Sequence, residues 1–304
     1  MSNLKLNQLE MLVAVVDNGG FGAAAAALDC TQSRVSHAIT ELENVLGVRL
    51  LSRSRSGCVA TDAGQRVVQQ ARDVLQLTHR MVEGANEDAA LAGRVRVACF
   101  RSVATHLLPN AIAALALEHP AIRVDIDDAF QERDDVTRAV LEGRAEIGIA
   151  QLPVPASLLA YPFVSDAYVL VTPAALQLRA PVTWAQLAAL PYIQLDCPGA
   201  LAVLALCRAA GFDAPLTRTL ATDTSIAAMV RLGVGYSILP RLAVFPEPDG
   251  VRIVDLPISA PRRFALVVRP DTARDKVVQA VTRFIRNKRI VSRSDVFKAA
   301  LVAW

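Results

Sequence analysis

The sequence contains few of the residues that build disulfides, metal sites or redox centres. Its five cysteines are odd in number and scattered, without a CxxC pair, and only four histidines occur in 304 residues. Neither a disulfide framework nor a tetrahedral zinc site is therefore predicted. No HExxH or carboxylate box accompanies His79 or His106. We accordingly expect no metal ion and no cofactor.

Long uncharged runs and catalytic signatures are also lacking. The longest uncharged stretch, residues 147–165, is interrupted by three prolines and favours strand, loop and strand over a membrane span. No GxSxG, Walker lysine loop or recognisable pair of carboxylates is present, so no enzyme and no catalytic residue is predicted. The beginning, MSNLKLNQLEML, lacks the pattern of an export signal. We expect a cytoplasmic protein without membrane partners.

The composition is that of a folded, helix-rich chain. Hydrophobic residues make up 53% and charged residues 20%, and the length allows two or three domains. The formal net charge is only +3, so overall charge gives no indication of a nucleic-acid partner.

The first 60 residues predict three short helices and a hairpin. Only Asp29 and Cys30 separate the second helix from a third, which Thr31 can cap and Gly47 can end. The third helix carries an aliphatic face at i, i+4, i+7 and i+11, formed by Val35, Ile39, Leu42 and Leu46. Two helices joined by a tight turn, the second amphipathic, form the geometry that places a helix in the DNA major groove.

The polar face of this third helix is a candidate DNA-contacting surface. Its residues are Thr31, Gln32, Ser33, Arg34, Ser36, His37 and Thr40, and the hairpin adds Arg53 and Arg55. Glutamine can bond adenine, arginine can bond guanine or phosphate, and hydroxyls can bond phosphates. The alternative is a polar face that is merely solvated.

A long helix is predicted over residues 61–90, beginning at Thr61. Its apolar residues alternate in steps of four and three across Val67, Ala71 and Val74 and continue to Met81. So apolar a seam favours a partner helix and hence a dimer. The alternative is an amphipathic helix packed on its own domain.

From Arg94 onward, strands and helices alternate and predict an α/β region over residues 91–304. One lobe comprises about 94–160 and 267–288, the other about 161–266, and a tail of 289–304 follows. The first lobe is expected to contain a helix over 102–118 and a parallel sheet with right-handed crossovers. The tail carries apolar residues at helical spacing, enough for a small helix that docks on a lobe or on a neighbour.

Beyond these patterns, the chain resembles the LysR-type transcriptional regulators. The motifs GGF, TQS, LE, LG, RL and T-AG between Leu9 and Gly64 recur at this family's spacing, and GRAEIGIA and RLGVGYSILP lie where its later pattern expects them. The resemblance implies a winged helix-turn-helix, a dimerising linker helix and a two-lobed domain like type 2 periplasmic binding proteins. Double-stranded DNA, a small-molecule effector, a homodimer and a homotetramer are the partners it implies, with RNA polymerase as a further candidate.

The resemblance also places an effector between the two lobes, beyond the carboxyl ends of the strands. The residues expected there are Phe100, Arg101, Ser102, Gln151, Asp196, Cys197, Thr222 and Asp223. Arg101 could hold a carboxylate, which predicts an anionic metabolite. The alternatives are an arginine in a surface ion pair and a serine that only caps a helix.

Two other functions remain open. Some members of the family sense peroxide through cysteines in the second lobe, where Cys197 and Cys207 lie, but the polar residues of that motif are replaced here by PGALAVLAL. A cytosolic small-molecule-binding protein would share residues 94–288. The N-terminal helix-turn-helix pattern argues against it.

Overall fold

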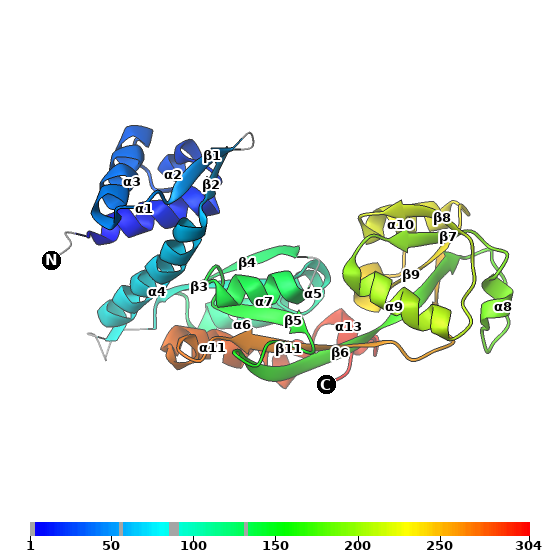
Figure 1. The fold of residues 1–304 in the computed structure, drawn as a ribbon. Coiled ribbons are helices and arrows are strands. Elements are labelled where there is room, and N and C mark those ends of the chain that lie inside the picture. Colours follow the sequence, from blue (N-terminus) through cyan, green and yellow to red (C-terminus); the bar gives the residue numbers. More distant parts are fainter. Residues whose placement is uncertain (1–3, 55–56, 85–90, 131–132) are drawn as a thin grey trace. The chain divides into compact units, whose positions relative to one another are not determined.

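The computed structural model describes residues 4–54, 57–84, 91–130 and 133–304. Contacts between residues divide the chain into two units. The first comprises residues 1–89 with 142–144, and the second comprises 90–141 with 145–304. Figure 1 labels the elements of each unit.

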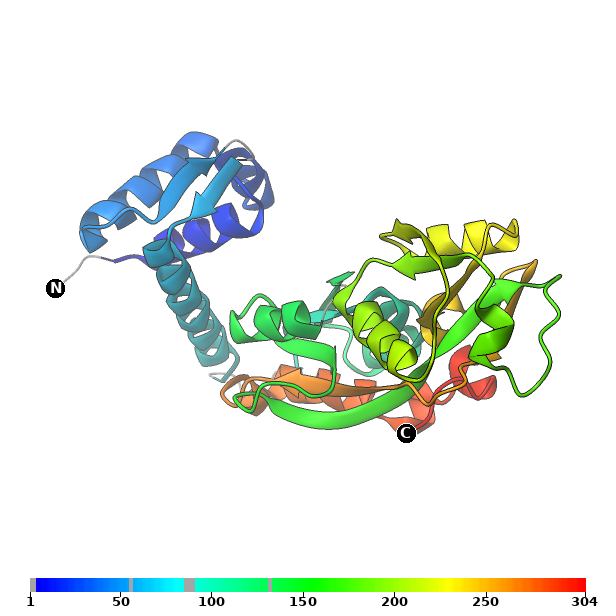
Figure 2. The same cartoon turned by 45° about the vertical axis from the view of Figure 1, so that its right-hand side comes forward.

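The N-terminal unit contains the predicted helices and hairpin (Figure 2). Its elements are α1 (Leu6–Asp17), α2 (Phe21–Ala27), α3 (Gln32–Leu46), β1 (Leu51–Ser54), β2 (Gly57–Ala60) and α4 (Asp62–Gly84). Strands β1 and β2 pair antiparallel. Apolar residues from α1 to α4 form one buried cluster, in which Leu12, Val15 and Leu42 are fully enclosed.

Capping residues set the ends of these helices as the sequence predicts. The Thr31 hydroxyl accepts a hydrogen bond from Arg34 N at 3.3 Å, and Gly47 ends α3 in the left-handed conformation with φ of 70°. The Thr61 hydroxyl accepts a bond from Gly64 N at 3.0 Å at the start of α4. Each cap satisfies a backbone group that the helix itself leaves unpaired.

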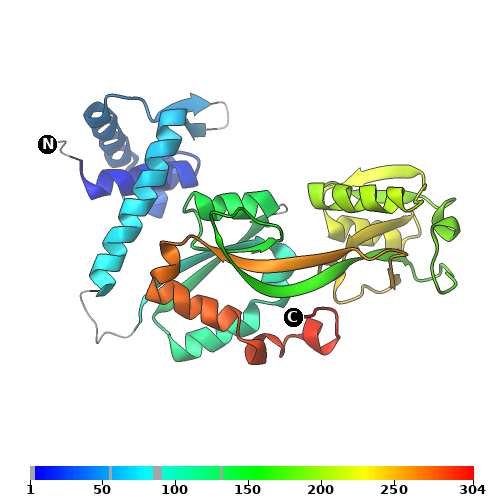
Figure 3. The ribbon, with the colours of Figure 1, turned by 60° about the horizontal axis from the view of Figure 1, so that its bottom comes forward.

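The second unit is built on a mixed sheet. Its strands are β3 (Gly93–Phe100), β4 (Ile122–Phe130), β5 (Ile147–Gln151), β6 (Leu159–Pro173), β7 (Tyr192–Leu195), β8 (Leu216–Leu220), β9 (Tyr236–Pro240), β10 (Val251–Asp255) and β11 (Pro261–Val268). The order is β4-β3-β5-β11-β6-β9-β7-β8, with β10 paired to β6. Strand β3 lies parallel to β4 and β5, as predicted, whereas β11 and β6 are antiparallel to their neighbours. Figure 3 shows β6 and β11 running side by side.

Helices cover this sheet between the strands. They are α5 (Arg101–His106), α6 (Pro109–Glu118), α7 (Arg133–Leu141), α8 (Trp184–Leu187), α9 (Pro198–Ala209), α10 (Asp223–Arg231), α11 (Lys276–Ile285), α12 (Lys288–Val291) and α13 (Asp295–Lys298), with 3-10 turns η1 (Arg241–Val244) and η2 (Thr272–Arg274). The single helix predicted over 102–118 is wrong. It breaks at Leu107 and Leu108, because Pro109 has no N–H to continue α5 and instead begins α6.

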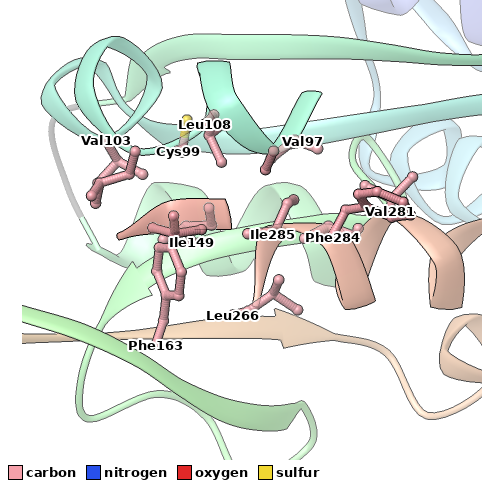
Figure 4. Packing of buried hydrophobic residues seen from close by; sticks show 14 of the residues in the cluster. Val97, Cys99, Val103, Leu108, Ile149, Phe163, Leu266, Val281, Phe284 and Ile285 are labelled. Atoms are coloured by element: carbon pink, nitrogen blue, oxygen red, sulfur yellow. The ribbon is translucent and has the colours of Figure 1, made fainter. Parts of the chain in front are cut away.

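Strands β6 and β11 each supply residues to more than one buried cluster. Phe163 and Leu266 belong to a cluster that also contains Ile149, Phe284 and residues of the tail (Figure 4). Tyr168, further along β6, belongs to a second cluster built from β7, β9 and α9. Strand β6 therefore contributes to two cores, and Phe163 and Leu266, which the predicted bounds placed in the second lobe, pack in the first core.

The C-terminal tail docks on the first of these cores rather than extending as one helix. Val296 in α13 is fully buried in the cluster of Phe163. Ser165 N donates to Ala303 O at 2.7 Å, and Ala303 N donates to Ser165 O at 2.9 Å. The Trp304 ring stacks on Phe297 with centroids 5.0 Å apart. These contacts decide between the two expectations for the tail, since its partner is its own lobe.

Within the described residues, no single helix is both long and apolar enough to cross a bilayer. Helices α1 and α2 together have the length and apolar composition of a span, but a bend of 117° separates them.

Candidate DNA-binding helix and ligand pocket

Helix α3 separates its residues into a buried and a solvent-facing side. Val35, Ile39 and Leu42 are at most 3% exposed. All seven residues predicted for the polar face are exposed, namely Thr31, Gln32, Ser33, Arg34, Ser36, His37 and Thr40. The aliphatic side fixes the helix on its own domain, and the polar side is left accessible to a partner.

Some of these polar groups are already engaged within the helix. The Thr31 hydroxyl accepts the bond from Arg34 N, and the Thr40 hydroxyl donates to Ser36 O at 2.9 Å. His37 Nδ1 lies 3.8 Å from Glu41 Oε1. No carboxylate occupies the first turn of α3, so its N-terminal amides remain suited to an anion.

The hairpin begins beside the same helix. Glu43 is 8% exposed, and its Oε1 accepts a hydrogen bond from Leu50 N at 2.7 Å. Its Oε2 pairs with Arg49 Nη1 at 3.0 Å. Glu43 thereby ties the approach to β1 to α3, a role that its charge alone did not suggest. Arg55 lies outside the described residues, and only the backbone of Arg53 is described, where it pairs with Cys58.

The apolar seam predicted along α4 has two different surroundings. Val68 and Ala71 are at most 3% exposed and pack in the core of their own unit. Further along the seam, Val74 and Met81 are 40% and 67% exposed, and Leu77, which was not part of the predicted seam, is 52% exposed. The first turns thus follow the alternative of packing on the same domain, whereas the later turns present uncovered apolar side chains.

The second unit contains a pocket of about 530 Å³ between strand ends and helix starts. This volume lies within the roughly 300–1,000 Å³ typical of small-molecule sites. Seven of the eight predicted effector residues line it: Phe100, Arg101, Ser102, Gln151, Cys197, Thr222 and Asp223. Asp196 is exposed and is not among the lining residues. The rule that ligands meet the carboxyl ends of strands therefore placed most of the predicted residues on the pocket, although most of the lining was not predicted.

Two exposed ion pairs lie on the wall formed by β4, α5 and α7. Arg101 Nε is 3.9 Å from Asp128 Oδ2, and Arg133 Nε is 2.8 Å from Asp134 Oδ1. The hydrogen bond and charge of Arg133 lower the pKa of the Asp134 carboxyl. Arg101 is thus in a surface ion pair, which is the alternative that the sequence left open for it. The sequence did not identify Asp128, Arg133 or Asp134 as lining residues.

Arg262, which lines the pocket, belongs to a buried ion pair that the sequence did not reveal. Arg262 on β11 donates from Nε to Asp166 Oδ1 at 2.8 Å and from Nη2 to Asp166 Oδ2 at 2.6 Å. Leu242 N also donates to Asp166 Oδ2, at 3.1 Å. The Arg262 guanidinium lies over the rings of Tyr168 and Phe264, with 5.5 and 5.0 Å to their centroids. Burial opposes the charge on Arg262, but the carboxylate of Asp166 outweighs it and raises the pKa of Arg262.

The two cysteines of the second lobe differ in setting. Cys197 caps α9, where its Sγ accepts a bond from Ala200 N at 3.4 Å, and it lines the pocket. Cys207 is fully buried, and this burial raises the pKa of its thiol to about 11. All five cysteines lie in described segments and none forms a disulfide. In the same described residues, no cluster of three or more His, Cys, Asp or Glu side chains could hold a metal ion.

Two protein-family models match the chain. The model of the bacterial regulatory helix-turn-helix protein, lysR family, matches residues 6–65, and that of the LysR substrate binding domain matches residues 88–289. The chain belongs to the LysR family of transcriptional regulators. It is therefore a DNA-binding transcriptional regulator with an effector-binding domain, as the resemblance implied.

Individual relatives agree with this assignment. The probable HTH-type transcriptional regulator LrrA of Synechococcus elongatus is 38% identical over 264 residues, which cover 85% of this chain and 88% of the relative. A probable hydrogen peroxide-inducible genes activator of Mycobacterium leprae is 29% identical over 289 residues, covering 91% and 92%. Both are similar along most of their length, so the family applies to the DNA-binding and the regulatory parts together.

A solved structure shows the same fold. A full-length OxyR variant from Pseudomonas aeruginosa superposes with a TM-score of 0.69 at 23% identity, over 95% of this chain and all of that one. The family's helix-turn-helix and its two-lobed mixed α/β domain are thereby both accounted for.

Proposed function

We propose that α3 reads operator DNA through its exposed polar face, with Gln32 and Arg34 as base-contacting residues. The observation that carries this proposal is the division of the helix, with all seven residues of its predicted polar face exposed and the aliphatic side buried in the core. Gln32 suits adenine, Arg34 suits guanine or a phosphate, and the remaining hydroxyls suit phosphates. We also propose that Arg53 and Arg55, in the hairpin that forms the wing, contact the DNA backbone.

Alanine substitution tests these assignments. Gln32→Ala and Arg34→Ala should each weaken binding to a duplex selected by the wild-type protein, by about 1–3 kcal/mol, and blunt discrimination at one base step. Asn44→Ala is the control, because Asn44 is exposed near the C-terminal end of the same helix, beyond Thr40, the last predicted contact residue. Fluorescence anisotropy with selected and scrambled duplexes measures both quantities. Unchanged affinity and discrimination in both variants would remove these residues from the interface.

We further propose that the exposed later turns of α4 pair with the same helix of a second chain. Val74, Leu77 and Met81 supply the uncovered apolar surface for such a pairing. A dimer carries two recognition helices and reads an imperfect palindrome, and two dimers would form a homotetramer. We also propose a cytoplasmic location, RNA polymerase as a further partner and no enzymatic role, since such a regulator acts on the chromosome.

Regulation is proposed to arise in the pocket. Its walls come from different segments around the strands that join the two cores, so an occupant that prefers one arrangement of the lobes changes the population of that arrangement. By linkage, the same occupant changes DNA affinity or spacing. The charges of the lining do not favour the anionic effector that Arg101 alone suggested, because Arg101 lies beside Asp128.

Thiol-based peroxide sensing is supported less well by the residues. A sensor thiol is accessible and has a low pKa, whereas Cys207 is buried with its pKa raised to about 11. Only Cys197 lies at the pocket. Similarity to the peroxide-inducible relative therefore does not by itself assign peroxide sensing to this chain.

A further inference from the structure

Acidic groups at the pocket outnumber the basic groups. Three arginines line it, and each lies within 4 Å of a carboxylate: Arg101 with Asp128, Arg133 with Asp134, and Arg262 with Asp166. No lysine or histidine is among the lining residues. Each cation of this pocket therefore already has a carboxylate beside it.

Asp223 is the acidic lining residue that remains. It is the first residue of α10, and its Oδ1 accepts a hydrogen bond from the backbone N of Thr224 at 2.8 Å. Among the residues that the structure describes, no lysine, arginine or histidine lies within ion-pair distance of this half-buried carboxylate. The pocket thus presents one negative charge without a protein counter-ion.

Anionic and cationic ligands would meet different competition from these groups. An anion reaches Arg101 only in competition with Asp128, and it reaches Arg262 only in competition with the bidentate bonds of Asp166. A positively charged donor meets Asp223 without a competing cation, in surroundings where a charge-assisted hydrogen bond is stronger than in bulk water. Electrostatic complementarity therefore favours a cationic group on the ligand.

The rest of the lining indicates the body of the ligand. Phe100, Phe130, Leu195 and Val203 supply apolar surface, while Ser102 and Gln151 add uncharged donors and acceptors. From this lining we propose that the pocket binds an organic ammonium compound, an amine or an amino acid with an apolar body, whose ammonium group pairs with Asp223. This inference rests on the proposed role of the pocket as the effector site and names its ligand class.

Matched ligands test the proposal on the full-length protein. The panel consists of the proteinogenic amino acids, the amines that lack their carboxyl group and the acids that lack their amino group, such as leucine, isoamylamine and isocaproate. Thermal shift identifies binders, and isothermal titration measures their Kd. At least one amine-bearing member should raise Tm while its deaminated acid does not. Binding of the amine shows that no carboxylate is required, and binding of the amino acid but not of the amine shows that one is. Both outcomes support the proposal.

Substitution of Asp223 supplies the second arm. Asp223→Asn keeps an oxygen that can accept the Thr224 bond and should raise the Kd of the amine-bearing ligand roughly tenfold or more. Asp196→Asn is the control, because Asp196 is an exposed aspartate near the same strand ends that does not line the pocket. It should bind as the wild type does.

Three outcomes would overturn the ammonium assignment. They are binding of the deaminated acids in place of the amines, unchanged ligand affinity in Asp223→Asn, and a panel in which no amine-bearing compound binds. DNA affinity, measured with and without the bound compound, is read separately. A ligand that needs Asp223 but leaves DNA binding unchanged would support the ligand class and contradict the proposed regulatory role of the pocket.

Discussion

At the scale of single residues, Gly64 determines how closely α4 can approach the chain before the hairpin. A Cβ atom at this position would lie 1.9 Å from Leu50 O and 2.9 Å from Leu50 C. Both atoms belong to the backbone, which Glu43 and Thr61 hold through hydrogen bonds to Leu50. A side chain therefore cannot be accommodated by a rotamer change.

Gly64→Ala should accordingly destabilise the N-terminal unit by about 3 kcal/mol, the upper end for an overpacked site. Gly20→Ala is the matched control, because nothing lies within 4 Å of its added Cβ and its φ of 170° is open to any residue. The control should change stability by less than about 1 kcal/mol. Urea unfolding followed by circular dichroism measures both. Equal midpoints for Gly64→Ala and the wild type would contradict the close approach.

At the scale of elements, the buried pair of Asp166 and Arg262 fastens β6 to β11 where the two strands pass between the cores. Their residues are paired in the sheet as well, with Arg262 opposite Asp166. The Asp166 side chain is fully buried and that of Arg262 is 5% exposed. Removing one partner leaves the other charge buried without compensation, which is costly.

Asp166→Asn should therefore lower the stability of the regulatory unit by roughly 3–5 kcal/mol. The double variant Asp166→Leu with Arg262→Met should recover part of that loss, since apolar replacements of a buried pair are often tolerated. The urea midpoint of the regulatory unit measures the effect. A single variant as stable as the wild type would show that the pair does not hold the strands together.

Sequence patterns predicted elements better than the contacts between them. The aliphatic spacing of α3 and its caps, Thr31 and Gly47, identified that helix and its exposed face. The alternation of strands and helices from Arg94 onward was also predicted, and the second unit has it. The break before Pro109 was missed, although a proline inside a helical pattern is a known signal of a new helix start.

The candidate pocket was predicted only in part, because local sequence patterns indicate elements better than the contacts between them. The strand-end rule was applied to β3, β5, β7 and β8, and it found residues that line the pocket. Applied to β4 as well, it would have reached Asp128 and Phe130. No local signal could have found the pairing of Asp166 with Arg262, because 96 positions separate them and only the sheet brings them together. Long-range register is a property of tertiary packing rather than of local sequence.

At the scale of the whole molecule, the proposed function depends on coupling between an accessible helix and a candidate ligand pocket in one chain. The family assignment accounts for both parts. The central claim is that the N-terminal unit binds duplex DNA through α3, because the proposed regulation has no output without it. Contacts to phosphates release counter-ions, so such binding must weaken as salt rises.

Anisotropy of a labelled duplex titrated with the full-length protein at increasing salt tests this claim most directly. We predict measurable affinity for duplex DNA that falls at least tenfold between about 50 and 200 mM salt. The slope of log K against log salt should become shallower in Arg34→Ala if Arg34 contacts a phosphate. Absence of binding at low salt, or an affinity that does not change with salt, would contradict the account.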